Sequence, residues 1–216
     1  MKLHRRLLAL ALLGAATAQA ADGSFGDAAS FLASAGSTAM ESFENQPGRR
    51  RELTPIDTPL FTIGTTTTPI GVQVGPDAPS TGFGAHAVGD GSRYLSVYLA
   101  GQPQGPITFQ LAAPATAFGL YLVDVGETSG QIIFKTNAGA FSGTGLSVDA
   151  TPQPDGGVRF LGFTQTQAFT QVTLTVTGID EAYGVDQVYV SAVPEPASAL
   201  LMSLGLAGLL AARRRR

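Results

Sequence analysis

The chain has 216 residues, no cysteine and a formal net charge of −3. Without cysteine it has no disulfide, no thiolate nucleophile and no cysteine-ligated metal. From Asp22 to Val193, six basic residues stand against fifteen acidic ones, a net charge of −9, so this part has no electrostatic footprint for nucleic acid.

The N-terminal segment, 1–21, has the three parts of a secretory signal peptide. Lys2, Arg5 and Arg6 give it a basic start, positions 7–16 form an apolar centre, and Ala-Gln-Ala at 18–20 is a small-residue cleavage site. We therefore expect the segment 1–21 to be removed on export, with the new N-terminus at Ala21 or Asp22.

Residues 22–192 are expected to form one β-sandwich domain. Residues 22–40 allow a short helix or an irregular lead-in. Beyond them, most apolar runs are short, are rich in Val, Ile, Phe, Tyr and Thr, and are separated by turn residues. Strands are predicted at 40–44, 60–63, 70–74, 93–99, 106–111, 118–123, 131–136, 158–163, 169–176 and 183–190.

The spacing of these runs is typical of an all-β, antiparallel β-sandwich. The clearest alternation lies at 171–177, where Val172, Leu174 and Val176 should face the core and the polar residues between them should face water. We expect a jelly-roll-like sandwich, with an immunoglobulin-like sandwich as the alternative.

The C-terminal segment, 193–216, forms a tail in three parts. Pro194, Glu195 and Pro196 break any helix and hold the chain extended. Residues 197–212 are apolar and uncharged, which predicts a short hydrophobic helix that inserts into the inner membrane. Four arginines end the chain as a cytoplasmic stop: Arg213, Arg214, Arg215 and Arg216.

This order of Pro-Glu-Pro, hydrophobic span and arginine cluster resembles the PEP-CTERM sorting signal of Gram-negative, exopolysaccharide-producing bacteria. The resemblance implies recognition by an exosortase, a membrane protease that would cut near Pro194, Glu195 and Pro196. It also implies a transient stay in the inner membrane through 197–212, followed by transfer to the cell surface or release into the extracellular biofilm matrix. A plain C-terminal membrane anchor is the alternative.

A second, looser resemblance covers most of the chain between the signal peptide and the tail. The runs at 106–109, 117–124 and 183–190 are similar to those of the β-sandwich ectodomains that often precede such signals, and these in turn are similar to jelly-roll carbohydrate-binding modules. In such modules an acid near the first strand and another near the last hold a structural calcium ion, and the matching positions are Glu44 and Asp186.

Acidic residues at strand ends are suitable oxygen ligands for calcium, although the chain has no Asp-x-Asp-x-Asp-Gly loop. The calcium hypothesis names four of them: Glu44, Asp124, Asp180 and Asp186. Their other interpretation is ordinary turn capping and loop solvation. No other cofactor is expected.

Catalytic chemistry has little support in the sequence. His86 is the only histidine outside the signal peptide, and no Gly-x-Ser-x-Gly elbow surrounds a serine, so neither a multi-histidine zinc site nor a typical hydrolase triad is indicated. Paired carboxylates for glycoside hydrolysis have no diagnostic spacing. The basic run Arg49, Arg50 and Arg51 is interpreted as a solvated loop edge.

The sequence therefore predicts an exported, non-enzymatic protein of the cell envelope or matrix, associated with exopolysaccharide. A carbohydrate-binding module with structural calcium is the alternative, and a hydrolase is a third hypothesis. The expected partners are an exosortase and an extracellular polysaccharide.

Overall fold

The computed structural model describes residues 21–75, 84–89, 91–98, 105–125, 130–150, 154, 156–177, 182–192 and 205. Residues 20–193 form one compact unit. Its elements are the helix α1 (Ala28–Ala35) and the strands β1 (Gly23–Phe25), β2 (Ala39–Glu41), β3 (Ile56–Asp57), β4 (Phe61–Thr65), β5 (Ile70–Val74), β6 (Arg93–Tyr98), β7 (Ile107–Val123), β8 (Gly130–Thr136), β9 (Leu146–Ala150), β10 (Val158–Val176) and β11 (Ala182–Ala192).

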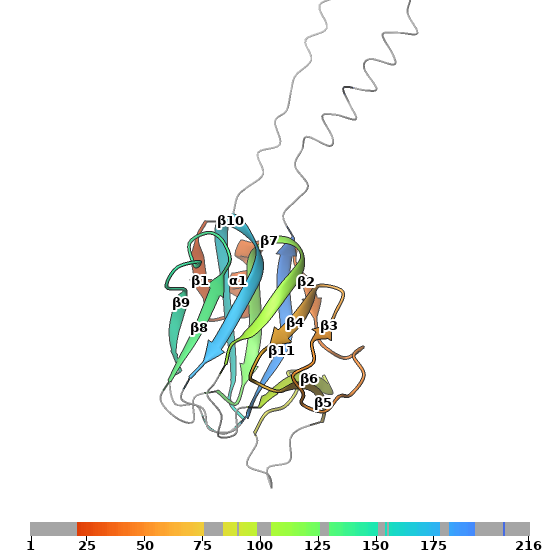
Figure 1. Ribbon diagram of the computed structural model, residues 1–216. Coiled ribbons are helices and arrows are strands. Elements are labelled where there is room, and N and C mark those ends of the chain that lie inside the picture. The colour runs from red at the N-terminus through yellow and green to blue at the C-terminus, as the bar shows by residue number, and fades with distance from the viewer. Residues whose placement is uncertain are drawn as a thin grey trace, which may run out of the picture. The chain divides into compact units, whose positions relative to one another are not determined.

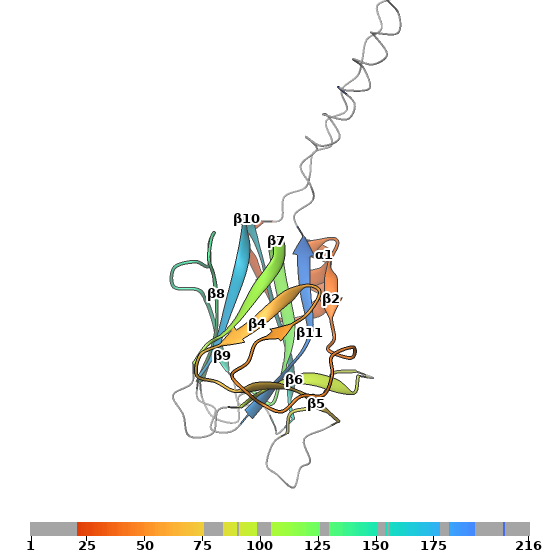
Figure 2. The same cartoon turned by 45° about the vertical axis from the view of Figure 1, so that its right-hand side comes forward.

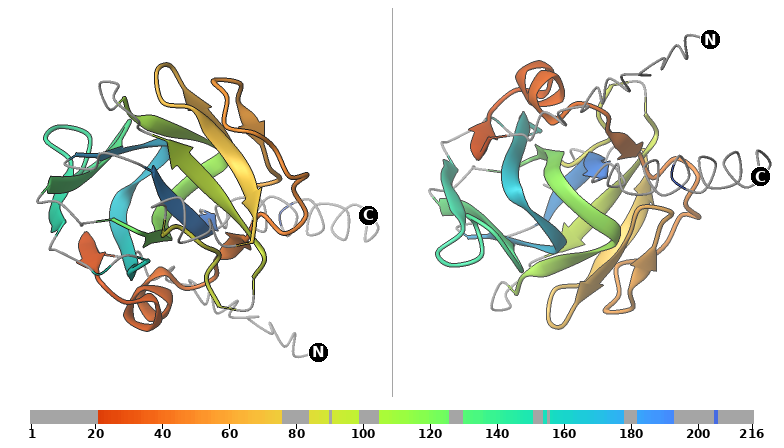
Figure 3. Two further views of the ribbon diagram at one scale, coloured as in Figure 1. Left: turned by 90° about the horizontal axis from the view of Figure 1, so that it is seen from below. Right: turned by 90° about the horizontal axis from the view of Figure 1, so that it is seen from above.

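The strands form an all-β, antiparallel arrangement of two layers, which confirms the predicted class (Figure 1). The first layer has the order β3-β4-β7-β10-β8-β9, using the start of β7 and the end of β10. The second has the order β5-β6-β11-β7-β10-β1, with β2 also on β11. Figure 3 shows the layers end-on, with α1 outside them.

Two long strands belong to both layers. The predicted strands 106–111 and 118–123 are one strand, β7, and the predicted strands 158–163 and 169–176 are one strand, β10. Between Thr164 and Phe169 the register of β10 against β7 shifts, which marks an irregularity at the point where both strands pass between layers. Such irregularities bend a strand without ending it. Because they interrupt the regular alternation of side chains, the sequence indicated two separate strands in each case.

The core lies between the two layers. Phe109 from the first layer and Phe118 from the second are fully buried, with ring centroids 5.2 Å apart. The alternation predicted at 171–177 is confirmed, because Val172, Leu174 and Val176 are all buried. Burying such side chains supplies about 1.5–3 kcal/mol each, so the sandwich needs no disulfide.

The lead-in to the sandwich is more ordered than the sequence indicated. Asp27 caps α1 by accepting a 2.8 Å hydrogen bond from the Ser30 N–H, and Gly36 ends the helix at φ +72°. The strand predicted at 40–44 ends at Glu41, so Glu44 lies in the turn that follows. The strands β1, β3 and β9 were not predicted.

The predicted C-terminal helix at 197–212 and the sorting tail lie outside the described residues, apart from Gly205. In the described part of the chain, no helix is long and apolar enough to cross a membrane.

Candidate functional site

Three of the four acids named for calcium, Glu44, Asp124 and Asp186, accept hydrogen bonds from one segment of the chain, residues 84–93. We call this the anchored segment; all of it except residue 90 is described. Asp124, which directly follows β7, accepts hydrogen bonds from the Gly84 N–H at 2.9 Å and from the Gly156 N–H at 2.8 Å, one on each carboxylate oxygen. The Asp124 side chain therefore joins the start of the anchored segment to the turn before β10.

Asp186 and Glu44 hold the rest of the anchored segment. Asp186, on β11, accepts a 2.7 Å hydrogen bond from the Val88 N–H. Glu44 accepts bonds from the N–H groups of Ser92 and Arg93 at 2.7 and 2.8 Å, and from the Ser92 hydroxyl at 2.8 Å. Charge-assisted hydrogen bonds of this kind are stronger than neutral ones, so these acids fix a long loop against the sandwich.

The positions matched to the calcium ligands of carbohydrate-binding modules, Glu44 and Asp186, lie in the turn after β2 and on β11. β2 pairs with β11, with Glu41 opposite Val188. Burial raises the pKa of Asp186 to about 6; hydrogen bonds from Val88 and Gln187 oppose this rise, and the nearby carboxylates of Glu44 and Glu41 add to it. For Glu44 burial acts to raise the pKa, but the hydrogen bonds from Arg93 and Ser92 outweigh it and the pKa is lowered.

The described acids do not form a metal cluster. Among the residues that the structure describes, no group of three or more His, Cys, Asp or Glu side chains is arranged to hold a metal ion. Asp180 lies outside the described residues. Because both oxygens of Asp124 and of Asp186 already accept backbone N–H bonds, an ion would have to compete with these donors. The four-residue calcium site stays a prediction.

His86 lies in the anchored segment, half-buried, with its Nδ1 3.1 Å from the Gly84 carbonyl oxygen. In the tautomer that protonates Nδ1, the ring donates to this oxygen and helps to fold the loop on itself. The Gly156 turn is its neighbour, since an added Cβ at Gly156 would be 3.7 Å from His86 Cε1.

An aromatic cluster on the outer face of the second layer was not predicted. Phe31 of α1 is fully buried over the sheet and packs on Phe160 at 5.4 Å between centroids. Gly119 and Gly162 leave the space for this ring, because a Cβ at Gly162 would be 2.8 Å from Phe31 Cδ2. Glycines inside strands often mark such close approaches, and this is the signal that the sequence offered.

Two tyrosines extend this cluster toward the anchored segment. Tyr121 and Tyr189 are half-buried and pack on Phe160 at 5.1 and 6.2 Å between ring centroids. The Tyr189 hydroxyl donates to Gln187 Oε1 at 3.1 Å, and Gln187 Nε2 donates to the Val88 carbonyl oxygen at 3.3 Å. The Tyr189 ring is thus tied to the same loop that the acids anchor.

The basic run 49–51 is more than a solvated edge. Arg49 donates to the carbonyl oxygens of Thr54 and Pro55, and Arg51 donates to Ser96 Oγ. Beside the run lies a shallow cavity of about 340 Å³, lined by Gly48, Arg49, Arg50, Val72, Gln73 and Val74.

Comparison with known families identifies the tail. Residues 192–216 match the family described as the PEP-CTERM protein-sorting motif, which confirms the resemblance drawn from the sequence. The chain therefore carries a PEP-CTERM sorting motif at its C-terminus. Such a motif implies processing by an exosortase and a location at the cell surface or outside the cell.

Comparison of the fold returns β-rich domains of low identity. The chain is similar to the K1 cleaved adhesin domain of Lys-gingipain from Porphyromonas gingivalis W83, with 13% identity, coverage of 74% of this chain and 100% of that one, and a TM-score of 0.44. It is also similar to the CBM22-1 xylan-binding domain of Paenibacillus barcinonensis Xyn10C, with 14% identity, coverage of 72% and 95%, and a TM-score of 0.38. No curated protein matches the sequence.

Proposed function

We propose that the protein is a non-enzymatic surface or matrix protein that an exosortase processes and that associates with exopolysaccharide. One observation carries the processing part of the proposal: the sorting motif begins at residue 192, where the last strand of the sandwich ends. The chain passes from folded domain to sorting signal without an intervening segment.

This placement makes removal of the tail compatible with a folded product. β11 pairs with β2, β6 and β7, and all of these pairings lie between residues 182 and 192. A cut at Pro194, Glu195 or Pro196 would remove none of the paired residues. The released domain would keep β11 with neighbours on both sides.

The N-terminal boundary supports the same processing scheme. Thr164 Oγ1 donates to the Ala21 carbonyl oxygen at 2.6 Å, and the Thr166 N–H donates to Asp22 Oδ1 at 2.7 Å. Removal of the signal peptide before Ala21 would therefore leave a chain whose first residues are bound to β10. Removal before Asp22 would lose only the first of these two hydrogen bonds.

The test is the intact mass of the protein from the culture supernatant and envelope of its native host. We expect an N-terminus at Ala21 or Asp22 and a C-terminus near Pro194–Pro196. Glu195→Ala should leave the tail attached, whereas Glu52→Ala, an exposed acid far from the motif in sequence, should be processed normally. A wild-type chain that still ends at Arg216 and stays in the inner membrane would contradict the proposal and indicate a plain tail anchor.

The association with polysaccharide needs its own measurement. The exported form should sediment with exopolysaccharide purified from the host and should release no reducing sugar from it. Sedimentation independent of the polysaccharide would remove this part of the proposal, and sugar release would contradict the non-enzymatic part.

A carbohydrate-binding module with structural calcium is the second candidate. The observation that favours it is the pairing of β2 with β11, which brings Glu41 and Glu44 near Asp186; burial is the main cause of the raised Asp186 pKa, and these two carboxylates add to it. In this case retention on polysaccharide should require calcium and should be lost in EDTA.

A further inference from the structure

The basic run lies flat along an edge of the second layer, beside β5. The Arg49 N–H donates to the Val72 carbonyl oxygen at 2.8 Å, and Glu52 and Ile70 exchange two hydrogen bonds of 2.8 and 2.9 Å. Gly71 permits this approach, because a Cβ there would be 2.6 Å from the Arg49 carbonyl oxygen. In Figure 2, β5 and β6 cross the lower end of the sandwich, so the run is at one end of the folded unit.

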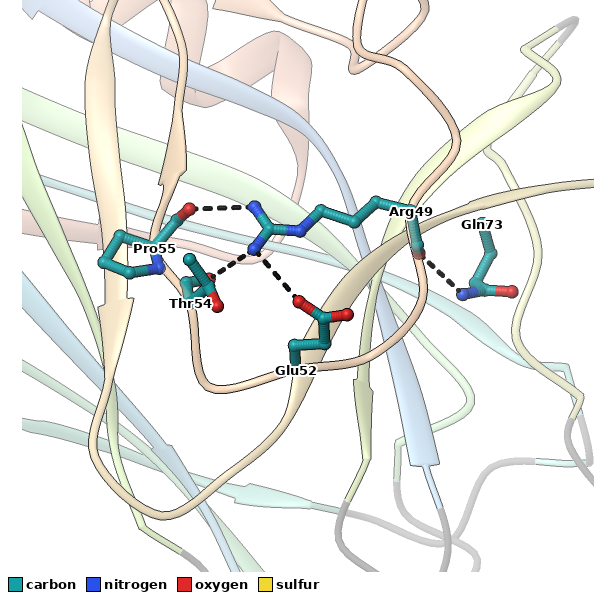
Figure 4. Close-up of polar contacts among 5 residues, drawn as sticks. All are labelled: Arg49, Glu52, Thr54, Pro55 and Gln73. Atoms are coloured by element: carbon teal, nitrogen blue, oxygen red, sulfur yellow. Dashed lines mark hydrogen bonds and ion pairs between the residues drawn. The ribbon is translucent and has the colours of Figure 1, made fainter.

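Two of the three arginine side chains bond to other groups of the same domain. The Arg49 guanidinium lies 2.9 Å from the Pro55 carbonyl oxygen and 3.6 Å from the Glu52 carboxylate, and its own carbonyl oxygen accepts from Gln73 Nε2 (Figure 4). Arg51 bonds to Ser96 Oγ at 2.8 Å and lies over the Tyr98 ring, 5.3 Å from its centroid. These contacts fix the backbone on either side of Arg50.

Arg50 has a different environment. Its side chain is exposed and lines the 340 Å³ cavity, and in the part of the chain that the structure describes no side chain or carbonyl group bonds to its guanidinium. Gln73 and Val74 line the same cavity, and Val74 is 61% exposed. The cavity therefore presents the exposed Arg50 side chain beside the exposed Val74 side chain.

The basic residues of the exported domain are concentrated around this cavity. Four of its six basic residues, Arg49, Arg50, Arg51 and Arg93, lie on the run or on β6 next to β5. Arg93 is paired with Val74 in the ladder and donates to the Gln46 carbonyl oxygen. The domain as a whole has a net charge of −9, so it repels a polyanion at long range, and here four of its six basic residues lie together.

We propose that this cavity binds a carboxylate of an acidic polysaccharide, with Arg50 as the charged donor and Val74 in contact with the sugar ring. Guanidinium groups match carboxylates in geometry and can donate two parallel hydrogen bonds. The inference rests on the proposed association with polysaccharide and narrows the ligand to the class of uronic acid polymers.

The test uses affinity electrophoresis of the full chain in a non-ionic detergent, at low salt. The probe is polygalacturonate, and fully methyl-esterified polygalacturonate has the same backbone without the charge. The wild type should bind the acidic polymer and not the ester, and added sodium chloride should weaken the binding through screening. Arg50→Gln should weaken it by about three- to tenfold, the usual range for loss of one exposed charged hydrogen bond.

Lys135→Gln is the matched control, because Lys135 is an exposed cation on β8 in the other layer. It should bind as the wild type does. Equal weakening by both variants would show that only net charge matters, and equal binding of acid and ester would show that the carboxylate is not recognised. Either result would overturn the proposed site.

Two further outcomes separate this site from the proposed function. If the wild type and Arg50→Gln bind the host exopolysaccharide equally, the function stands and the site is wrong. If the wild type binds no polysaccharide at all, both the proposed site and the proposed association with polysaccharide are wrong. Arg50-dependent binding to phosphatidylglycerol vesicles, without binding to polygalacturonate, would assign the cavity to an anionic membrane and overturn the proposal.

Discussion

Asp186 should make the protein less stable as the pH rises, which is opposite to the usual effect of an acidic residue. Its side chain is 1% exposed, and burial raises its pKa to about 6, against an ordinary value of 3.8. The folded state therefore holds the proton more tightly than the unfolded state does. Because each pKa unit corresponds to about 1.36 kcal/mol, the shift is equivalent to a free energy on the order of 3 kcal/mol.

The direction follows from the sign of the shift. Because the folded pKa is raised, the stabilising contribution of protonated Asp186 is complete below about pH 3.8 and is lost as the pH rises through 6. Asp186→Asn removes this titration. It also points an amide NH₂ at the N–H of Val88 or Gln187, a pH-independent loss of about 1–3 kcal/mol.

The assay is urea unfolding followed by circular dichroism, since the chain has no tryptophan. The free energy of unfolding of the wild type minus that of Asp186→Asn should fall by up to about 3 kcal/mol between pH 4 and pH 7. Asp57→Asn, a change of an exposed acid on β3, supplies the baseline. A difference that is constant over this range, or that grows with pH, would refute the reasoning.

Three other changes test the fold and the acids. Gly119→Ala should lower the free energy of unfolding by about 1–3 kcal/mol, because the new Cβ would be 2.8 Å from Phe160 Cζ. Gly143→Ala should have little effect, because the space around Gly143 is open. Equal losses of stability in the two variants would contradict the tight packing of α1. Glu44→Gln should cost about 1–3 kcal/mol and expose the anchored segment to proteolysis near Ser92, and unchanged proteolysis would show that the segment is held otherwise. The calcium hypothesis requires that EDTA lower the melting temperature of the purified protein, and an unchanged temperature would end it.

The sequence alone was sufficient for the class of fold and for the tail. Val172, Leu174 and Val176 alternate with polar residues and are buried as predicted, because a strand turns successive side chains to opposite faces. The sorting motif was readable because its recognition depends on a linear order of residues, Pro194 to Arg216, and not on a folded surface.

The continuity of the long strands was decided by tertiary structure. Pro114 and the polar stretch near Thr166 look like ends of strands, yet β7 and β10 pass through them with shifted register. The bend is stable because each strand finds partners in both layers, and such pairing between residues far apart in the sequence has no local signature.

The candidate sites also depend on contacts between distant residues. The acids that anchor the loop lie far apart in the sequence: Glu44, Asp124 and Asp186. The sequence could indicate that they lie near strand ends, but it could not indicate that they hold the same loop. Arg49, Arg50 and Arg51 are chemically identical in the sequence. The fold places the carbonyl groups of Thr54 and Pro55 and the side chains of Glu52, Ser96 and Tyr98 against Arg49 and Arg51. Arg49 and Arg50 both line the cavity, and Arg50 is the exposed one of the three arginines.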